Sequence, residues 1–246
     1  MTTHALVRRA VALAALLAAA ASGHAATTLI YCSEGSPEGF DVARYTAGTT
    51  FDASSQALFN RLVEFEPDGT AVKPALAESW DISADGLVYT FKLRKGVKFH
   101  TTEWFKPTRE LNADDVAFSF ERQLNKEHPF TKAAPADFEY ANDMGLPTNV
   151  VKIDKPDAMT VRFTLKTVDA AFLANLAMDF ASIQSAQYAD QLLKAGSPND
   201  LNTKPVGTGP FVFRRYEKDA QIRYAAFDDF WRGRAKIDNL IFAITT

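Results

Sequence analysis

One stretch, Leu76–Phe120, constrains the fold more than any other part of the chain. Apolar and polar side chains alternate over Trp80–Ser83 and Tyr89–Arg94, on either side of Asp85-Gly86. A period of two predicts half-buried strands, and an Asp-Gly pair suits the tight turn of a hairpin. Downstream, Asn112 is followed at once by two aspartates, which is typical of a capped helix start. The chain must therefore combine an antiparallel sheet with helices.

Further strand and helix signals follow one another along the rest of the chain. Strands are expected over Thr28–Cys32, Val150–Asp154, Met159–Leu165, Phe211–Tyr216, Ile222–Phe227 and Asp238–Ile244, and helices over Ala53–Leu62, Phe172–Met178 and Ala186–Lys194. Asp52 is expected to cap the first of these helices. Ser33–Thr50 and Ala134–Thr148 are expected to be long loops, which are often functional. The pattern predicts a mixed α/β (α+β) protein, and 246 residues allow one or two domains.

Residues 1–25 have the composition of a secretory signal segment. Arg8 and Arg9 form its positive start, Val11–Ala21 is its apolar run, and Gly23-His24-Ala25 precedes the expected cleavage after Ala25. The apolar run is shorter than the roughly 20 residues of a membrane span. Cleavage removes two of the 27 basic residues and leaves a net charge of −5. No Lys/Arg-rich run remains, so the charge does not indicate a nucleic-acid surface.

The residues that could carry chemistry are few and scattered. After the signal segment only His100 and His128 remain, without the spacing of a zinc site, so neither a metal nor a cofactor is expected. An exported hydrolase that uses one of these histidines as its base stays an alternative. Gly207-Thr208-Gly209 is followed by Pro210 and a strand, which favours a turn or hinge over a dinucleotide loop. Asp114 and Asp115 are interpreted as capping residues rather than an acid/base pair.

Four landmarks and three further segments occur in order along the chain. The landmarks are Leu76–Trp80, Tyr89–His100, Leu111–Val116 and Gly207–Phe211, and the further segments are Tyr31–Phe40, Phe105–Glu110 and Met178–Ser182. The landmarks resemble those of the periplasmic solute-binding proteins of peptide ABC transporters, family 5 or cluster C. The further segments are most similar to the dipeptide-binding members of that family. The resemblance extends over about Thr28–Thr246.

The resemblance implies a periplasmic binding protein fold of type II, with two lobes that close on a ligand. The first ligand-binding lobe would comprise residues 26–60 and 205–246, and an inserted accessory domain would comprise residues 61–204. The second ligand lobe would follow residue 246, so the chain would be the N-terminal part of a family member. The implied function is capture of dipeptides or short peptides in the periplasm and their delivery to an inner-membrane permease. Such a protein would be a monomer and not an enzyme.

The resemblance also suggests which residues touch the ligand. A dipeptide is a zwitterion that needs an acidic and a basic partner, and the family places both in the lobe beyond residue 246. The Thr46-Ala47-Gly48 loop maps onto this chain, with Thr46 the first candidate for a peptide contact. Phe138 and Tyr140 are candidates for the wall of a side-chain pocket, with ordinary core packing as the alternative. In the most similar members Cys32 pairs with a cysteine beyond residue 246, so here it would be a free thiol.

Two questions stay open at the level of sequence. Relatives in this family also carry longer peptides, haem or nickel, so the ligand is less determined than the class of protein. A truncated chain that binds nothing is the second alternative, beside the exported hydrolase.

Overall fold

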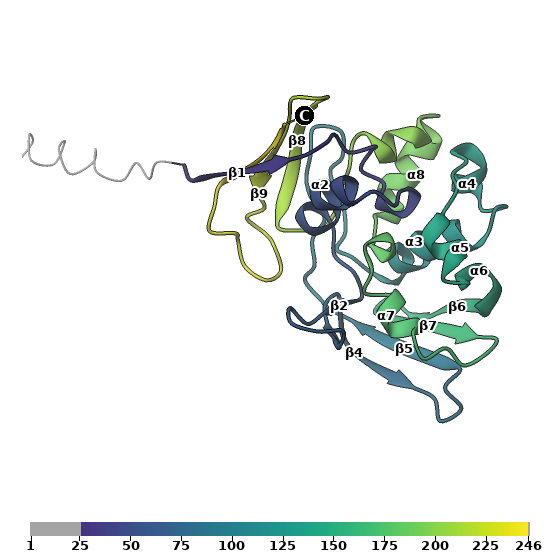
Figure 1. The fold of residues 1–246 in the computed structure, drawn as a ribbon. Coiled ribbons are helices and arrows are strands. Elements are labelled where there is room, and N and C mark those ends of the chain that lie inside the picture. The colour runs from purple at the N-terminus through teal and green to yellow at the C-terminus, as the bar shows by residue number, and fades with distance from the viewer. Residues whose placement is uncertain (1–25, 246) are drawn as a thin grey trace, which may run out of the picture.

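The computed structural model describes residues 26–245, so the predicted signal segment lies outside the described residues. The strands are β1 (Thr28–Ser33), β2 (Val63–Phe65), β3 (Val72–Pro74), β4 (Ala77–Ile82), β5 (Val88–Leu93), β6 (Val150–Asp157), β7 (Thr160–Leu165), β8 (Phe211–Glu217), β9 (Gln221–Ala226) and β10 (Asn239–Ile244). The α-helices are α2 (Gly48–Leu58), α3 (Ala113–Leu124), α4 (Pro129–Ala133), α5 (Glu139–Asp143), α6 (Leu146–Asn149), α7 (Phe172–Asn175) and α8 (Ala186–Lys194). Short 3-10 turns are η1 (Val42–Arg44), η2 (Asp179–Ala181) and η3 (Pro198–Asn202). The predicted mixed α/β class is confirmed (Figure 1).

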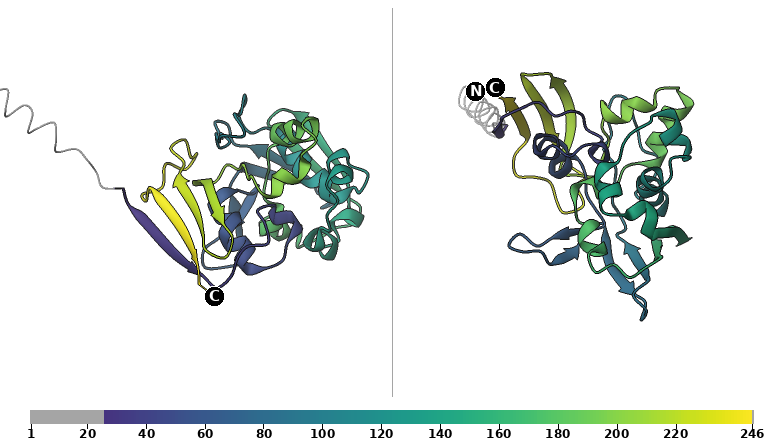
Figure 2. Two further views of the ribbon diagram at one scale, coloured as in Figure 1. Left: turned by 90° about the horizontal axis from the view of Figure 1, so that it is seen from above. Right: turned by 45° about the vertical axis from the view of Figure 1, so that its right-hand side comes forward.

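The first sheet joins the two ends of the described chain. Its strand order is β1-β10-β9-β8, with β1 parallel to β10 and the other pairs antiparallel. Figure 2 shows the purple N-terminal strand beside the yellow C-terminal one. Alternate residues of these strands, such as Phe213, Tyr224 and Phe242, are buried in one cluster with Leu58 of α2. The Tyr224 hydroxyl donates to the carbonyl of Ala53 and thereby ties the sheet to the helix.

The second sheet has the order β4-β5-β7-β6 and is antiparallel throughout. Gly86 turns the β4–β5 hairpin with φ of 72°, as the Asp-Gly pair predicts. Phe91 and Phe163 lie on its buried face, and Phe120 of α3 packs edge-on against Phe163 with ring centroids 5.1 Å apart. The helix that covers this sheet is the one that the sequence predicts from its cap.

The predicted cap of α3 is confirmed in detail. The Asn112 side chain accepts from the amide of Asp114 at 2.9 Å, and the Asp115 carboxylate accepts from the amide of Asn112 at 2.9 Å. Reciprocal bonds of this kind satisfy donors that a helix start leaves unpaired. Asp115 also forms a two-bond ion pair with Arg109 at 2.6 and 2.9 Å. The adjacent carboxylates are therefore held in structural contacts.

Some predicted segments differ from the structure. The expected loop over residues 33–50 contains η1 and the first residues of α2, and the helix expected over residues 172–178 ends at Asn175. The helix expected over residues 53–62 begins at Gly48 and ends at Leu58, and Asp52 lies inside it rather than at its cap. The expected loop over residues 134–148 contains α5 and most of α6, which are too short to show a periodic apolar pattern. Buried Ala141 and Leu146 anchor these two helices through tertiary packing.

The Gly207-Thr208-Gly209 segment presses against the end of α2. A Cβ atom on Gly207 would lie 1.8 Å from the carbonyl oxygen of Leu58, and one on Gly209 would lie 2.5 Å from the Leu58 carbonyl carbon. Real Cβ atoms do not approach so closely, so only glycine fits at both positions. The amide of Gly209 also donates to the Leu58 carbonyl at 2.9 Å. The glycines therefore serve close backbone packing here.

A buried ion pair joins the segment that leads into α2 with α3. Arg122 donates to both carboxylate oxygens of Asp41 at 2.8 and 2.6 Å, and both side chains are only 2% exposed. Gln184 donates to the same carboxylate at 2.8 Å. Burial opposes the ionisation of Asp41, but Arg122 and Gln184 outweigh it and lower the pKa of the carboxyl group.

The predicted division into a ligand-binding lobe and an accessory domain, with boundaries at residues 60 and 205, stays a prediction. Asp41 would belong to the lobe and Arg122 to the accessory domain, so the ion pair would join the two.

Replacing Arg122 with Met should lower the free energy of unfolding by about 3–5 kcal/mol, because it leaves the Asp41 carboxylate buried without its partner. The double variant Asp41→Asn/Arg122→Met should lose clearly less, since it removes both charges. Urea denaturation of the three proteins at pH 7 measures this. Equal losses in the single and double variants would contradict the argument.

Candidate functional site

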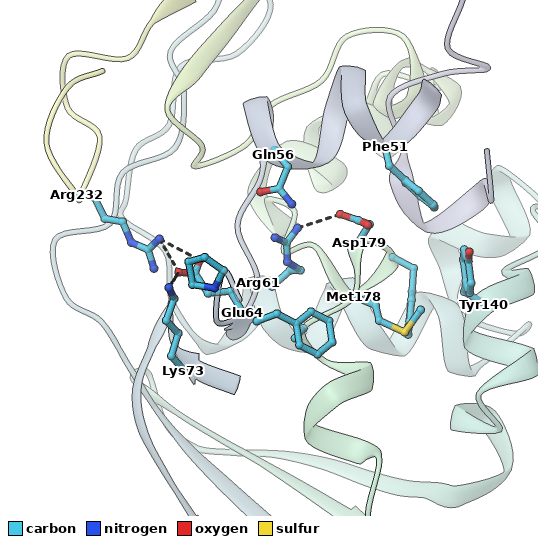
Figure 3. A pocket seen from close by; sticks show the side chains of 13 residues that line it. Phe51, Gln56, Arg61, Glu64, Lys73, Tyr140, Met178, Asp179 and Arg232 are labelled. Carbon is cyan, nitrogen blue, oxygen red and sulfur yellow. Dashed lines mark hydrogen bonds and ion pairs between the residues drawn. The ribbon is translucent and has the colours of Figure 1, made fainter. Parts of the chain in front are cut away.

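A cleft of about 570 Å³ lies between α2, β2, α5 and η2. Its lining changes from one end to the other (Figure 3). The aromatic end is formed by Phe51, Tyr140, Met178 and Phe180, and the ionic end by Arg61, Glu64, Lys73, Asp179 and Arg232. A cleft with one apolar and one charged end can hold a small amphipathic molecule in a fixed orientation.

The aromatic end brings together three segments that are distant in the sequence. The ring of Tyr140 lies 5.9 Å from that of Phe51 of α2 and 5.9 Å from that of Phe180 of η2. Tyr140 and Phe180 are nearly parallel, with 15° between their planes. Tyr140 is half-buried, so part of its ring faces the cleft. The structure therefore places one of the predicted site residues at a cavity.

The Thr46-Ala47-Gly48 loop forms the start of α2. Ala47 is the N-cap and has no side chain that could pair with the first helical amides. Thr46 and Gly48 are exposed, and a Cβ atom on Gly48 would meet no atom within 4 Å. Phe51 lies in the first turn of the same helix and lines the aromatic end of the cleft. The loop therefore offers backbone donors within one helical turn of the cleft.

Phe138 has a different environment from Tyr140. Its side chain is buried, and its ring lies under the guanidinium of Arg122, with 5.3 Å between the guanidinium carbon and the ring centroid. It does not line the cleft that Tyr140 lines. Its predicted role as a pocket wall stays a prediction.

Arg61 is the central residue of the ionic end. Its Nη1 donates to Ser55 Oγ at 2.7 Å and to Asp179 Oδ1 at 3.3 Å, and the Ser55 hydroxyl donates to Asp179. Burial lowers the pKa of Arg61, and the Asp179 carboxylate opposes that change. The sequence could not indicate this site, because Arg61 and Asp179 are 118 residues apart and belong to no motif.

A second ion-pair group closes the ionic end of the cleft. Arg232 pairs with Glu64 at 2.8 Å, and Lys73 lies 3.6 Å from the same carboxylate. Lys73 also pairs with Glu66 at 3.2 Å. The charged side chains that line this end therefore have ionic partners within the protein.

The two histidines are engaged in structural bonds. His100 is buried, its Nε2 donates to the carbonyl of Gly209 at 2.9 Å, and its Nδ1 accepts from the amide of Gly207 at 3.3 Å. Burial is the main cause that lowers the pKa of His100 to about 4. His128 Nδ1 accepts from the amide of Phe130 at 3.2 Å. Both nitrogens of His100 are therefore bonded to the backbone, which leaves this ring no free nitrogen to act as a base.

Cys32 is exposed in β1, and its expected pairing with a cysteine beyond residue 246 stays a prediction. Within residues 26–245, no three His, Cys, Asp or Glu side chains converge on a possible metal position. No helix in the same range is long and apolar enough to cross a membrane.

Comparison with solved structures defines the class of protein as solute-binding. The dipeptide-binding protein from Pseudoalteromonas sp. SM9913, in complex with Met-Leu, matches with a TM-score of 0.86 and 38% sequence identity. The match covers 89% of this chain and 43% of that protein. The chain belongs to the bacterial extracellular solute-binding proteins of family 5, whose middle-region profile matches residues 71–246. The family resemblance of the sequence is confirmed.

Two relatives show the range of ligands in the family. Di/tripeptide-binding protein 1 of Pseudomonas aeruginosa (strain UCBPP-PA14) is 60% identical, with 100% of this chain and 47% of the relative covered. Heme-binding protein A of Haemophilus influenzae (strain ATCC 51907 / DSM 11121 / KW20 / Rd) is 52% identical, with 88% and 40% covered. The chain thus spans less than half the length of each of these proteins.

The lowered pKa of His100 should make the stability of the folded protein depend on pH. The folded-state pKa of about 4 lies below the usual histidine pKa of 6.5. The unfolded chain therefore binds more protons between these pH values, and stability falls as the pH drops through this window. The shift corresponds to about 3 kcal/mol. In the His100→Gln variant, whose amide does not titrate, that part of the pH dependence should be missing.

Urea denaturation of both proteins between pH 4 and pH 7.5 checks this prediction. The difference in unfolding free energy should widen in favour of the wild type as the pH rises. A difference that does not change with pH would contradict a buried, neutral His100.

Proposed function

We propose that this chain supplies one wall of the peptide-binding site of a periplasmic binding protein that serves an ABC importer. The observation that carries the proposal is the uncapped start of α2 beside the half-buried ring of Tyr140. Amides at a helix start favour a carbonyl or carboxylate oxygen, and an aromatic cavity favours an apolar side chain. Di- and short peptides combine these two features.

The ligands named for similar proteins support this choice of ligand. Peptides are named for the Pseudomonas aeruginosa relative and for the Pseudoalteromonas complex, whereas haem is named for the Haemophilus relative. Thr46, Ala47 and Gly48 would pair with the peptide backbone, and Tyr140 would contact a side chain. The acidic and basic partners of a zwitterion would come from sequence outside this chain. The protein would bind its ligand without transforming it.

The wider role follows from the same family relationship. We expect the whole protein to act in the periplasm as a monomer and to deliver its ligand to an inner-membrane permease. A nucleic-acid partner is not expected, because the chain carries more acidic than basic residues.

The isolated chain should bind a dipeptide weakly, at about millimolar concentration, because one wall cannot enclose a ligand. A titration with Ala-Phe, followed by the backbone NMR signals of residues 26–246, measures this. The signals of Thr46–Gly48 and Tyr140 should shift most. Micromolar affinity, or shifts confined to other surfaces, would contradict the proposal.

Replacing Gly48 with Leu should weaken Ala-Phe binding without lowering stability. The new side chain has free space in the folded protein but would project where the peptide backbone is placed. We expect a loss of about fivefold, comparable to losing one hydrogen bond of about 1 kcal/mol. The matched control is Ala133→Leu at an exposed position of α4, which should bind as the wild type does. Equal affinity of all three proteins would exclude Gly48 from the contact surface.

A further inference from the structure

We propose that the hydroxyl group of Tyr140 donates a hydrogen bond to the peptide carbonyl of the ligand, so that this residue selects ligands with an acceptor beside their apolar side chain. This inference rests on the proposed function and adds a specificity-determining contact to the same site. In a dipeptide the peptide carbonyl lies within a few atoms of either side chain, so peptides meet this requirement.

The first observation is that the hydroxyl of Tyr140 has no partner in the protein. The chain has seven tyrosines, and all lie within residues 26–245. The other six each make a side-chain hydrogen bond to another residue, and they are Tyr31, Tyr45, Tyr89, Tyr188, Tyr216 and Tyr224. Tyr140 alone makes no such bond to any described residue. Its donor is therefore available to a ligand.

The second observation is that this hydroxyl can be reached from the cleft. Tyr140 is half-buried and lines the cleft. Within the described residues, side-chain atoms that are both closed off and unpaired occur in Arg61, Trp104, Arg122 and Gln123, but not in Tyr140. The oxygen of its hydroxyl therefore keeps access to solvent, and a ligand atom can take the place of that solvent.

The ring that carries the hydroxyl is held between two others. Phe180, which is completely buried, stacks on it with 15° between the planes, and Phe51 lies 5.9 Å from it at 41°. Figure 3 shows Tyr140 beside Phe51 and Met178, at the end of the cleft away from Arg232. These contacts restrict the ring before a ligand arrives, which lowers the entropy cost of a hydrogen bond to it.

The aromatic end offers a peptide few other polar groups. Of the four side chains that form it, only Tyr140 can donate a hydrogen bond, since the others are Phe51, Met178 and Phe180. A carbonyl group that leaves water for an apolar cleft needs a new donor. The ring of Tyr140 would contact the ligand side chain, and the hydroxyl at the tip of the ring would bond to the main chain next to it.

The alternative is that Tyr140 contacts the ligand through its ring alone, while its hydroxyl stays hydrated. Tyr140→Phe separates the two roles, because it keeps the ring and removes only the hydroxyl. The ligands are Ala-Phe and its thioamide analogue, in which a sulfur atom replaces the peptide oxygen and accepts hydrogen bonds more weakly. The dissociation constants come from the backbone NMR signals of Thr46–Gly48.

The matched control is Tyr216→Phe. Tyr216 is also half-buried, but it does not line the cleft, and its hydroxyl donates to the carbonyl of Pro37 at 3.5 Å. It should bind both ligands as the wild type does. Since the Tyr140 hydroxyl has no partner in the protein, Tyr140→Phe should also keep the urea midpoint of the wild type, so a change in its affinity would not reflect a loss of folding.

We expect Tyr140→Phe to bind Ala-Phe about fivefold more weakly than the wild type does, as for the loss of one neutral hydrogen bond. Replacing oxygen by sulfur in the ligand should weaken binding to the wild type and leave binding to Tyr140→Phe nearly unchanged, because that variant has already lost the donor.

Two results would overturn this inference and leave the proposed function intact. One is unchanged affinity of Tyr140→Phe for Ala-Phe, with the Thr46–Gly48 signals still shifting. The other is an equal loss in both proteins when sulfur replaces oxygen, which would assign the carbonyl to another donor. No shift at Thr46–Gly48 or at residue 140 with either ligand would overturn the inference and the proposed function together.

Discussion

The buried ion pair between Asp41 and Arg122 determines the geometry on which the candidate site depends. Asp41 directly precedes η1, and the chain continues from there into the Thr46–Gly48 loop. Arg122 belongs to α3 and covers the ring of Phe138, two residues before Tyr140. One desolvated pair therefore fixes the helix start that offers the backbone donors and the segment that carries the aromatic ring. Such a pair stabilises little by itself, but breaking it leaves a buried charge, so it strongly favours one arrangement.

Other contacts hold the same parts together from different sides. Gly207 and Gly209 lie against the end of α2, and the ring of His100 bridges their backbones. Ser55, Arg61 and Asp179 connect the middle of α2 to η2. Tyr224 ties α2 to the first sheet. The helix is thus held along its length, while Gly48 at its first position is exposed.

The sequence predicts those features that depend on local patterns. The β4–β5 hairpin follows from alternation around Asp85-Gly86, and the cap of α3 follows from Asn112 and Asp115. The sequence does not predict where α2 begins, because Ala47 has no capping side chain and Gly48-Thr49-Thr50 are poor helix formers. Packing against the first sheet decides the conformation there. The segment most informative about the family, around β4 and β5, lies in the second sheet and not at the cleft.

The candidate site, too, depends on contacts between segments that are distant in the sequence. Thr46, Gly48 and Tyr140 are indicated by resemblance, whereas Arg61, Asp179 and Phe51 become visible only when distant segments meet. Phe138 and Tyr140 are close neighbours in sequence, yet one packs on Arg122 and the other faces the cleft. Side-chain direction in a short helix such as α5 is set by tertiary contacts that no local pattern encodes.

If the start of α2 and the ring of Tyr140 face one peptide, a bound dipeptide must lie close to both. Adding a dipeptide with a nitroxide-labelled side chain and measuring the broadening of each NMR signal shows where it lies. We expect the strongest broadening at Tyr140 and Phe51, then at Thr46–Gly48, and none along β6 and β7. Broadening centred on the exposed strand β1, or spread evenly over the chain, would contradict it.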